Sequence, residues 1–519
     1  MCNEFVGGAT LDYDRAIDTD ANSVNYIDTI LTDDKLYRYL NAGTVLLAAM
    51  TLRYENLAEH LLNAIAQNLY RPGERLPSVR QLSQQHQVST ATAVSALRLL
   101  EDQGHLEARQ RSGYYVKPRP HSPLLEPAIS APPREPTLVT GQELVLRLVK
   151  AANDPRIVQL GAAVPSASFL PTQKMAQLSA SVARRYGQRI ANYEFPPGAL
   201  ELRRQIARRM SEQGCPVDPK DILITNGCQE AMSLALRAVT KPGDIVAVES
   251  PTFYGLLQVI ESLSLRAIEI PTHPRDGIAL DALQLACEQW PIKACIAVPN
   301  YSNPLGYCMS DERKRALVEL VNRYRIALIE DDIYGDLGFG VQRPSMAKSW
   351  DSEGRVLYCS SFSKSLCPGL RVGWLVAGPY LEQTEYLKYV GNLATPTHAQ
   401  LSVAEMLAKG GYERHLRQAR NQYRQAVDRM TAAIGTYFPL GTRVTQPEGG
   451  FVIWVELPET VDATALSRRA LQQGISIAPG PMFSATQKYR NFIRLNCAVD
   501  WDERVNQALV RLGQMVGGQ

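Results

Sequence analysis

The sequence lacks several features that would indicate particular classes of protein. Its nine cysteines include no CxxC pair and no cluster with histidine, which argues against a metal site or a disulfide framework and favours a reducing cytoplasm. No basic segment followed by an apolar run begins the chain, and no apolar run is long enough for a membrane span, so we expect neither a signal peptide nor a membrane helix. Strong charge is also lacking. The net charge is +3 and the pI about 8.3, so any contact with nucleic acid must be local.

The composition is that of a large globular protein. The 519 residues are 45% hydrophobic and 21% charged, and the length has room for several domains. Residues 1–50 stand apart, because they carry eight acidic and three basic side chains with little periodicity before an apolar run at 45–50. Three interpretations stay open for this extension: a disordered acidic tail, a short helix near residues 36–49, or a start site assigned upstream of the true one at Met50.

Residues 54–116 predict three helices followed by a hairpin. Leucine and isoleucine recur at helical spacing in the first helix, at positions 57, 61, 62, 65 and 69. A second helix is expected after Ser78, which suits an N-cap, and a third from about residue 90 to Gly104. Two short strands at 105–109 and 114–116, joined by a turn at 111–113, complete the unit.

This order of elements is typical of a helix-turn-helix with a wing. One helix of such a unit lies in the major groove, while the wing holds the adjacent backbone. The candidate DNA-contacting residues lie on the second helix, the turn, the third helix and the wing: Arg80, Ser89, Thr90, Thr92, Arg109 and Arg111. From the pattern alone, a generic three-helix bundle with ordinary surface arginines is an equal alternative.

Four short motifs favour the DNA-binding interpretation. The chain resembles the GntR-type winged helix over residues 54–116, through Arg71-Pro-Gly-Glu-Arg-Leu-Pro-Ser-Val-Arg80, Val88-Ser89, Leu99-Leu-Glu-Asp-Gln-Gly104 and Ser112-Gly-Tyr-Tyr-Val116. The resemblance implies binding to double-stranded DNA. Many members of that family have an arginine where this chain has Thr90, so the operator sequence is not implied.

The rest of the chain begins with a linker. Seven prolines at residues 118–136 cannot bury a core and indicate a semi-rigid tether. Apolar strand-like runs at 245–249, 294–298, 326–330 and 356–359 then alternate with helical patterns such as 229–239 and 310–324, which predicts an α/β domain with ligand groups at the carboxyl ends of its strands. We therefore expect an extension at 1–50, a winged helix at 51–117, a linker at 118–140, and a domain at 141–519. Its large α/β part ends near 396, and a smaller α+β part follows at about 397–519.

Lys364 carries the strongest chemical signal. An apolar run at 356–359 delivers it among small hydroxyl residues, and Arg371 follows. A lysine with a lowered pKa forms a Schiff base with an aldehyde, and an arginine with hydroxyls binds a phosphate. An aldehyde and a phosphate on one small molecule suggest pyridoxal phosphate. This cofactor also needs backbone amides for its phosphate, a carboxylate for its ring nitrogen, donors for its ring oxygen and a stacking partner.

Those groups follow strand ends in a sensible order, and residues 141–519 resemble fold-type I aminotransferases, close to the aspartate aminotransferase superfamily. The resemblance implies that Lys364 is the Schiff-base lysine, Asp331 the partner of the ring nitrogen, and Phe253 the aromatic that stacks on the ring. It assigns the ring hydroxyl to Asn303 and Tyr334 and the α-carboxylate of an amino acid to Arg494. The remaining cofactor positions are on the phosphate side: Gly227, Cys228, Gln229, Ser361, Ser363, Arg371 and, from the neighbouring subunit of a dimer, Tyr193. The SxxK motif at 361–364 and the Tyr-Ser-Asn at 301–303 also suggest penicillin-recognising enzymes, but their order is reversed and no Lys-Thr-Gly follows.

A GntR-type winged helix joined by a proline-rich tether to such a domain resembles the MocR subfamily of transcription regulators. We therefore expect a cytoplasmic, homodimeric regulator that binds pyridoxal phosphate and senses an amino acid or amine through the Lys364 aldimine. One alternative stays open, a working aminotransferase with an accessory DNA-binding domain. A DNA-binding protein with a cofactor-free scaffold is disfavoured, because the full set of cofactor ligands is retained. Retention of both Lys364 and Arg494 keeps transaminase turnover open.

Overall fold

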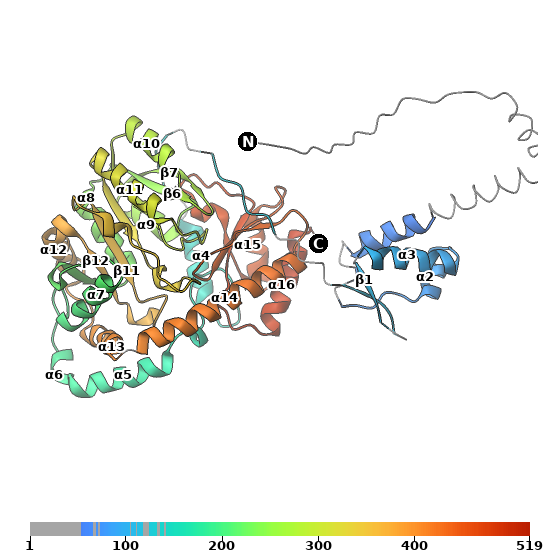
Figure 1. Ribbon diagram of the computed structural model, residues 1–519, viewed down its shortest axis with the longest axis horizontal. Coiled ribbons are helices and arrows are strands. Elements are labelled where there is room, and N and C mark those ends of the chain that lie inside the picture. Colours follow the sequence, from blue (N-terminus) through green and yellow to red (C-terminus); the bar gives the residue numbers. More distant parts are fainter. Residues whose placement is uncertain are drawn as a thin grey trace, which may run out of the picture. The chain divides into compact units, whose positions relative to one another are not determined.

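The computed structural model describes residues 53–65, 69–70, 73–103, 105–109, 112–117, 124–131, 135–139, 142–409 and 411–518 (Figure 1). The chain divides into two compact units, Met1–Pro120 and His121–Gln519, and each is described by itself. The expected extension at 1–50, Arg111 and parts of the proline-rich segment lie outside the described residues.

The first unit has the winged helix expected from the sequence. A helix at residues 53–65 precedes α2 (Val79–Gln85) and α3 (Thr90–Asp102). Ser78 caps α2 through a capping box with Gln81, and Ser89 caps α3. Leu57, Leu61 and Ile65 are buried with the inner faces of α2 and α3. The helical spacing was misleading at Leu69, which is 65% exposed.

The wing is an antiparallel hairpin. It pairs β1 (Leu106–Arg109) with β2 (Gly113–Val116) in the register Leu106 to Val116. The backbone of Arg75 bridges to Tyr115 and so adds a short third edge. The two ends of the hairpin, Leu106 and Val116, are buried in the helical core, so the wing is anchored to the helices at its base.

The second unit is built on a mixed sheet in the order β3-β7-β6-β9-β10-β11-β12-β5, with β8 paired to β7. Its central strands β7, β6, β9, β10 and β11 are parallel, as the sequence predicts, whereas β12 runs antiparallel to both β11 and β5. The strand bounds are β3 Thr137–Leu138, β5 Ile222–Thr225, β6 Ile245–Ser250, β7 Arg266–His273, β8 Gly277–Ile278, β9 Ile292–Ala297, β10 Ala327–Asp331, β11 Val356–Ser361 and β12 Gly373–Val376.

Helices cover both faces of this sheet, because successive side chains of a strand point to opposite sides. Val246 and Val248 of β6 pack in one core with α8 and α9, and Ile245 and Ala247 pack in another with α10 and α11. The helices of this part are α4 Gln142–Ala152, α5 Thr172–Arg185, α6 Gly187–Ile190, α7 Leu200–Glu212, α8 Cys228–Val239, α9 Tyr254–Ser262, α10 Leu280–Gln289, α11 Asp311–Tyr324, α12 Leu381–Asn392 and α13 Thr397–Ala408.

The C-terminal part packs helices on a small antiparallel sheet of order β13-β14-β17-β16. Its elements are β13 Arg443–Val444, β14 Val452–Glu456, β15 Ile475–Ser476, β16 Ala478–Pro479, β17 Phe492–Asn496, and the helices α14 Gly411–Tyr437, α15 Ala463–Gln472 and α16 Glu503–Val516. Two contacts join the large part to the smaller C-terminal part, which we expected to be divided near residue 396. Strand β4 (Val158–Gln159) pairs with β15, and α13 packs on α5 and α7.

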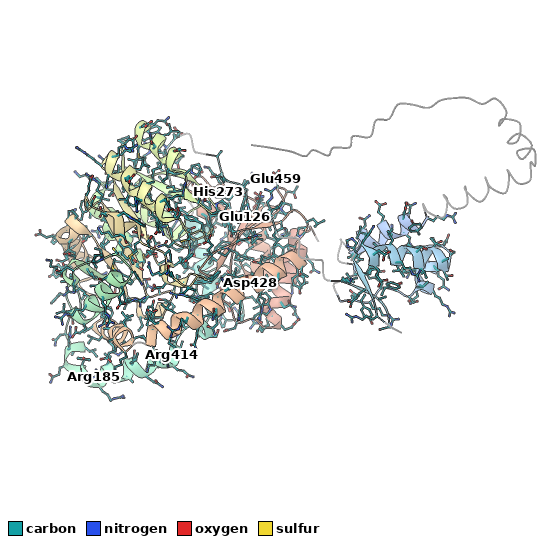
Figure 2. All side chains as sticks on the ribbon, in the orientation of Figure 1. Glu126, Arg185, His273, Arg414, Asp428 and Glu459 are labelled. Atoms are coloured by element: carbon teal, nitrogen blue, oxygen red, sulfur yellow. The ribbon has the colours of Figure 1, made fainter. Side chains whose placement is uncertain are left out.

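The described part of the proline-rich segment, which the sequence predicts to be a semi-rigid tether, contacts the rest of the second unit. Leu125 O accepts from Val444 N at 2.9 Å, and Glu126 pairs with Arg275 at 2.8 Å, close to His273 (Figure 2). Lys488 Nζ donates to Ala131 O at 3.1 Å. Residues 124–131 thus form a fixed strap that leads into β3 and α4. Within the described ranges, no helix is both long and apolar enough to cross a membrane, and no group of side chains suits a metal ion.

Candidate cofactor and DNA-binding sites

A cavity of about 300 Å³ lies at the carboxyl ends of the parallel strands. The loops after β5, β6, β9, β10 and β11 reach it, because these strands run in one direction. Nine of the residues singled out from the sequence line it together: Cys228, Gln229, Phe253, Asn303, Asp331, Tyr334, Ser363, Lys364 and Arg371. Segments that are far apart in the sequence therefore converge on one small site.

Lys364 lies partly buried in this cavity, and the pKa of its amine is shifted. Burial, followed by the charges of Arg494 and Arg371, lowers the pKa of Lys364 to about 8. A substantial fraction of the amine is therefore neutral near physiological pH, which is the form that attacks an aldehyde. Its Nζ donates to Ala163 O at 2.6 Å, in the segment that follows β4.

Helix α14 holds the backbone around this lysine. Tyr423 Oη donates to Lys364 O at 3.2 Å, and His415 Nε2 lies 2.7 Å from Ser365 O. Tyr412 Oη donates to Ser365 Oγ at 2.7 Å. Two side chains of one long helix thus hold the backbone at and after the lysine, and a third holds the side chain of Ser365.

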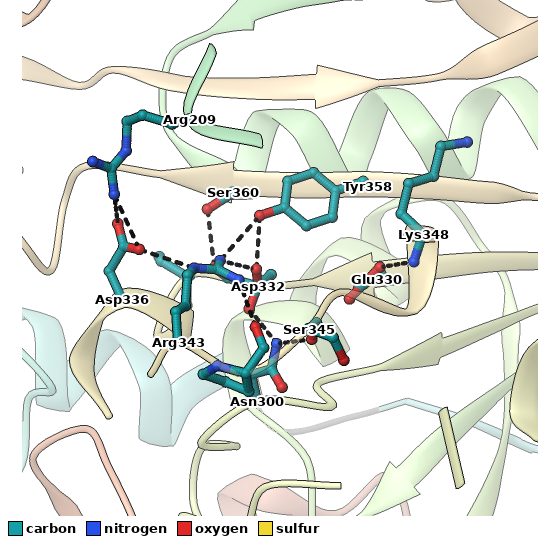
Figure 3. A network of polar contacts seen from close by, with 12 residues as sticks. Arg209, Asn300, Glu330, Asp332, Asp336, Arg343, Ser345, Lys348, Tyr358 and Ser360 are labelled. Atoms are coloured by element: carbon teal, nitrogen blue, oxygen red, sulfur yellow. Dashed lines mark hydrogen bonds and ion pairs between the residues drawn. The ribbon is translucent and has the colours of Figure 1, made fainter. Parts of the chain in front are cut away.

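Asp331 faces the same cavity, whereas its two acidic neighbours face away. Burial raises the pKa of Asp331 to about 6, and its Oδ1 accepts from the Cys228 thiol and the Ile333 amide, each at 3.2 Å. Figure 3 shows Glu330 and Asp332 in a separate polar network. Glu330 accepts from the amides of residues 347 and 348, and Asp332 accepts from Tyr358 Oη at 2.7 Å. A single carboxylate of this acidic run is therefore available to the cavity.

The cavity has an anion-binding end at the start of α8. Gly227 is the N-cap, with φ of +85°, and the free amides of the first helical turn follow it. Arg371 donates to Asn226 O at 2.9 Å and to Ser363 Oγ at 3.3 Å, which places its guanidinium beside that turn. The positive φ of Gly227 favours glycine, and an added Cβ would displace the guanidinium of Arg371. Amides, a hydroxyl and a guanidinium form a donor set that suits a phosphate.

The remaining lining residues suit a planar ring with a polar edge. Phe253 supplies an aromatic face, next to Tyr254 at a centroid distance of 4.7 Å. Asn303 Nδ2 lies 3.5 Å from Tyr334 Oη, so both can reach one ring substituent.

Arg494 is fully buried next to the cavity. Its Nη1 donates to Asn303 Oδ1 at 3.3 Å, and its Nη2 donates to Gly161 O. Its Nε has no partner among the described residues, so this guanidinium has unused capacity for an anion. A carboxylate that takes two donors from the fork would satisfy it.

Besides Arg494, three residues predicted to contact the cofactor are not part of the lining. Gly227 and Ser361 lie behind it, where Ser361 Oγ accepts from Ser363 N at 3.3 Å. Tyr193 is 69% exposed and touches Phe195 instead. Sequence reasoning missed α4 and residues 162–164, which also line the cavity. They carry small or aliphatic side chains without a chemical motif, so their place depends on tertiary packing that no local pattern reveals.

The DNA-contact candidates fall into two groups. Arg80, Ser89, Thr90 and Arg109 are exposed. Arg109 also pairs with Glu107 and lies over the ring of Tyr115, 4.2 Å from its centroid. Thr92 is 6% exposed, and its hydroxyl is 2.7 Å from that of Ser89, so it supports the start of α3 instead of facing outward. Arg111 lies outside the described residues.

Comparison with known proteins agrees with both units. The family model "Bacterial regulatory proteins, gntR family" matches residues 53–116, and "Aminotransferase class I and II" matches residues 156–512. The Escherichia coli protein named uncharacterized HTH-type transcriptional regulator YjiR is 43% identical, over 89% of this chain and 98% of its own length.

Solved structures resemble the second unit. Kynurenine aminotransferase from Pyrococcus horikoshii, in complex with PMP, has a TM-score of 0.68 and 28% identity over 73% of this chain and 95% of its own. The α-aminoadipate aminotransferase LysN from Thermus thermophilus, complexed with N-(5'-phosphopyridoxyl)-L-leucine, has a TM-score of 0.67 and 30% identity over 72% and 94%. The second unit is thus a fold-type I domain for pyridoxal phosphate, and the first is a DNA-binding domain. The chain belongs to the MocR-type transcription regulators of the GntR family, in which these two domains are fused.

Proposed function

We propose that this regulator senses a small amino acid or amine through Lys364 and transmits the event to its DNA-binding domain. The observation that carries the proposal is the convergence of Lys364, Asp331 and Arg371 in one cavity, with Arg494 beside it. This is a complete set for a cofactor and an amino acid, in a chain that also has a winged helix with an exposed face. Its site of action would be the cytoplasm, where DNA is present and where the eight described cysteines stay as free thiols.

The residues present fit pyridoxal phosphate at each of its groups. The first turn of α8, Ser363 and Arg371 would hold the phosphate, and Asp331 would hold the proton on the ring nitrogen. Phe253 would cover the ring, while Asn303 and Tyr334 would contact its hydroxyl. When bound, the cofactor supplies an aldehyde that condenses reversibly with amines. Lys364 occupies the position of the protein's own amine, and Arg494 is placed for the carboxylate of an incoming amino acid.

Two contacts suggest how binding reaches the rest of the chain. Lys364 donates to Ala163 O and Arg494 donates to Gly161 O, so both cations hold the same short segment. A ligand that engages these cations competes for those contacts. The segment is joined through β4 to α4 and the strap at 124–131, which leads to the winged helix. We infer that such a ligand shifts the population of two arrangements of this region.

The proposed active form is a homodimer. Exposed aromatic and aliphatic side chains gather at the loop of Tyr193 and on α12, where Phe195 lies 5.5 Å from Tyr193 and 6.2 Å from Tyr389 by ring centroids. Tyr386 is 67% and Val390 is 59% exposed. This apolar surface fits a second copy of the chain, which would also place Tyr193 at the partner's phosphate site. Phe195→Lys should lower the mass measured by light scattering towards that of a monomer. An unchanged mass would exclude this surface as the interface.

A titration of the purified holoprotein tests sensing. Amino acids and amines are added while the absorbance of the bound cofactor and the affinity for a promoter fragment are followed together. Both signals should change at the same ligand concentration in the wild type, and neither should respond in Lys364→Ala. An unaltered DNA response in that variant would exclude Lys364 as the sensor.

A working aminotransferase is the second candidate. The low pKa of Lys364 and the buried fork of Arg494 are what turnover needs, and both are retained. Turnover assays with an amino acid and a keto acid separate the two functions. Rapid keto acid exchange without any DNA response would favour the enzyme.

A further inference from the structure

The cavity has a wall that the proposed cofactor contacts do not use. It is made by residues of α4, the residue after it and the segment that follows β4, and we call it the α4 wall: Leu148, Val149, Ala152, Asn153, Ala162, Ala163 and Val164. The wall adjoins Lys364, whose amine the ligand's amine would replace, and Arg494, which would bind the ligand's carboxylate. Lys364 Nζ is 2.6 Å from Ala163 O, Arg494 donates to Gly161 O, and an added Cβ at Gly161 would clash with Leu148. A ligand held by its amine and carboxylate would therefore lie against this wall.

The α4 wall contains no charged side chain. Among the described residues that line the cavity, the charged ones are Asp331, Lys364 and Arg371, each assigned to the cofactor. Two cations of α4, Arg147 and Lys150, are not part of the lining, and Arg147 pairs with Glu143. Arg494 serves one carboxylate. A second carboxylate on the ligand would lose water without gaining a cation, which is unfavourable.

Two aliphatic side chains of the wall are still open to solvent. Val149 is 51% exposed and Val164 is 48% exposed, although both line the cavity. Leu148 behind them is 5% exposed and belongs to the core. An apolar side chain on the ligand would cover Val149 and Val164 and remove their surface from water, which is favourable.

We propose that the effector is an amino acid with one carboxylate and an apolar side chain, and that Val149 and Val164 select it. The inference rests on the proposed sensing function and narrows its ligand class. It assigns a specificity role to a helix that begins shortly after the interdomain segment.

Two amino acids of opposite side-chain character test the selection. The full-length holoprotein is titrated with L-leucine and with L-glutamate, following both cofactor absorbance and the unfolding temperature. L-Leucine should act at a concentration at least ~10-fold lower than L-glutamate. One apolar group that becomes buried, or one charged group left without a partner, changes the affinity by about this factor. A wild type that responds equally to both, or better to L-glutamate, would overturn the inference and leave sensing intact. No response to any amino acid or amine would overturn sensing itself.

Charged variants locate the selection on the wall. Val149→Lys and Val164→Lys each place a cation where a side-chain carboxylate would lie, so the preference for L-leucine should shrink or reverse. Leu146→Lys is the matched control, because Leu146 is on the same helix, is 57% exposed and does not line the cavity. It should keep the wild-type ratio. Wild-type ratios in both wall variants, with their cofactor absorbance intact, would contradict the assignment.

Discussion

The two units present their functional side chains in opposite ways. In the winged helix, Arg80, Ser89 and Thr90 are exposed at helix starts, and the cap contacts near them join residues close in sequence. In the pyridoxal phosphate unit, Lys364 is partly buried and Arg494 is fully buried, and they contact residues 201 and 333 positions away, respectively. The proposed DNA-contacting face therefore depends on a few local elements, whereas the cofactor site depends on the whole domain. Substitutions should separate the two.

Removal of the sensing amine should have the largest effect. Lys364→Ala leaves no amine for the cofactor aldehyde, so the absorbance of covalently held cofactor should vanish completely. Affinity for a promoter fragment in the absence of effector should persist, because the winged helix has its own core. Lys409→Ala, a half-exposed lysine outside the cavity, should leave the spectrum unchanged. Retention of the covalent signal in Lys364→Ala would mean that another lysine serves the site.

A substitution in the core of the winged helix should weaken DNA binding and leave the cofactor bound. Leu82 is fully buried between α2 and α3, and Leu82→Ala should destabilise this unit by about 2–5 kcal/mol. DNA binding should weaken strongly while the cofactor absorbance stays, as followed by thermal unfolding with both probes. Leu69→Ala, at a 65% exposed site, should change stability by at most about 0.5 kcal/mol. Simultaneous loss of both signals in Leu82→Ala would show that the units do not fold independently.

The same contrast explains what the sequence could predict. The ligand groups of the cofactor site follow strand ends, and the parallel strands bring those ends to one edge, so nine candidates converge as expected. The α4 wall was missed because Val149 and Ala152 have no chemical signature and reach the cavity through tertiary packing. Ala163 takes part through a backbone carbonyl, which any residue type supplies.

The winged helix shows a limit of a different kind. Its helices follow from local signals, and the cap at Ser78 was predicted correctly, whereas Ser89, predicted as a turn residue and a DNA contact, caps α3. Which side of α3 faces outward is set by packing, and this turns Thr92 inward although its neighbours Thr90 and Ala91 are exposed. Short polar side chains at a helix start serve equally as caps and as DNA contacts, so composition alone does not distinguish them.

Substitution of a single arginine on the exposed face of the winged helix should have an effect of intermediate size on DNA affinity. Arg80→Ala should reduce DNA affinity by about 1–3 kcal/mol, the usual worth of a specific contact. Fluorescence anisotropy with a promoter fragment measures it, with the cofactor spectrum as the internal control. Thr92→Ala should instead lower the stability of the winged helix, because it loses the contact with Ser89. A DNA defect in Thr92→Ala at full stability would assign it to the interface after all.

The smallest expected effect is on the pKa of Lys364, where it separates the contribution of burial from that of neighbouring charges. Because Lys364 has a pKa of about 8, the rate at which cofactor-free protein links to added pyridoxal phosphate should rise about tenfold from pH 7 to 9. With a lysine of ordinary pKa, the rate of this reaction would continue to rise beyond pH 10. Stability should depend on pH for the same reason. Between pH 8 and 10.5 the lysine binds a proton more tightly in the unfolded chain than in the folded protein. The free energy of unfolding of the unlinked protein should therefore increase with pH across that window. Burial lowers the pKa of Lys364 most, and the charge of Arg494 is the next largest cause. Arg494→Gln should therefore raise the pH at which the linking rate is half its maximum, but not to the value of a free lysine. A midpoint that does not move would show that the charge of Arg494 does not contribute to the low pKa of Lys364.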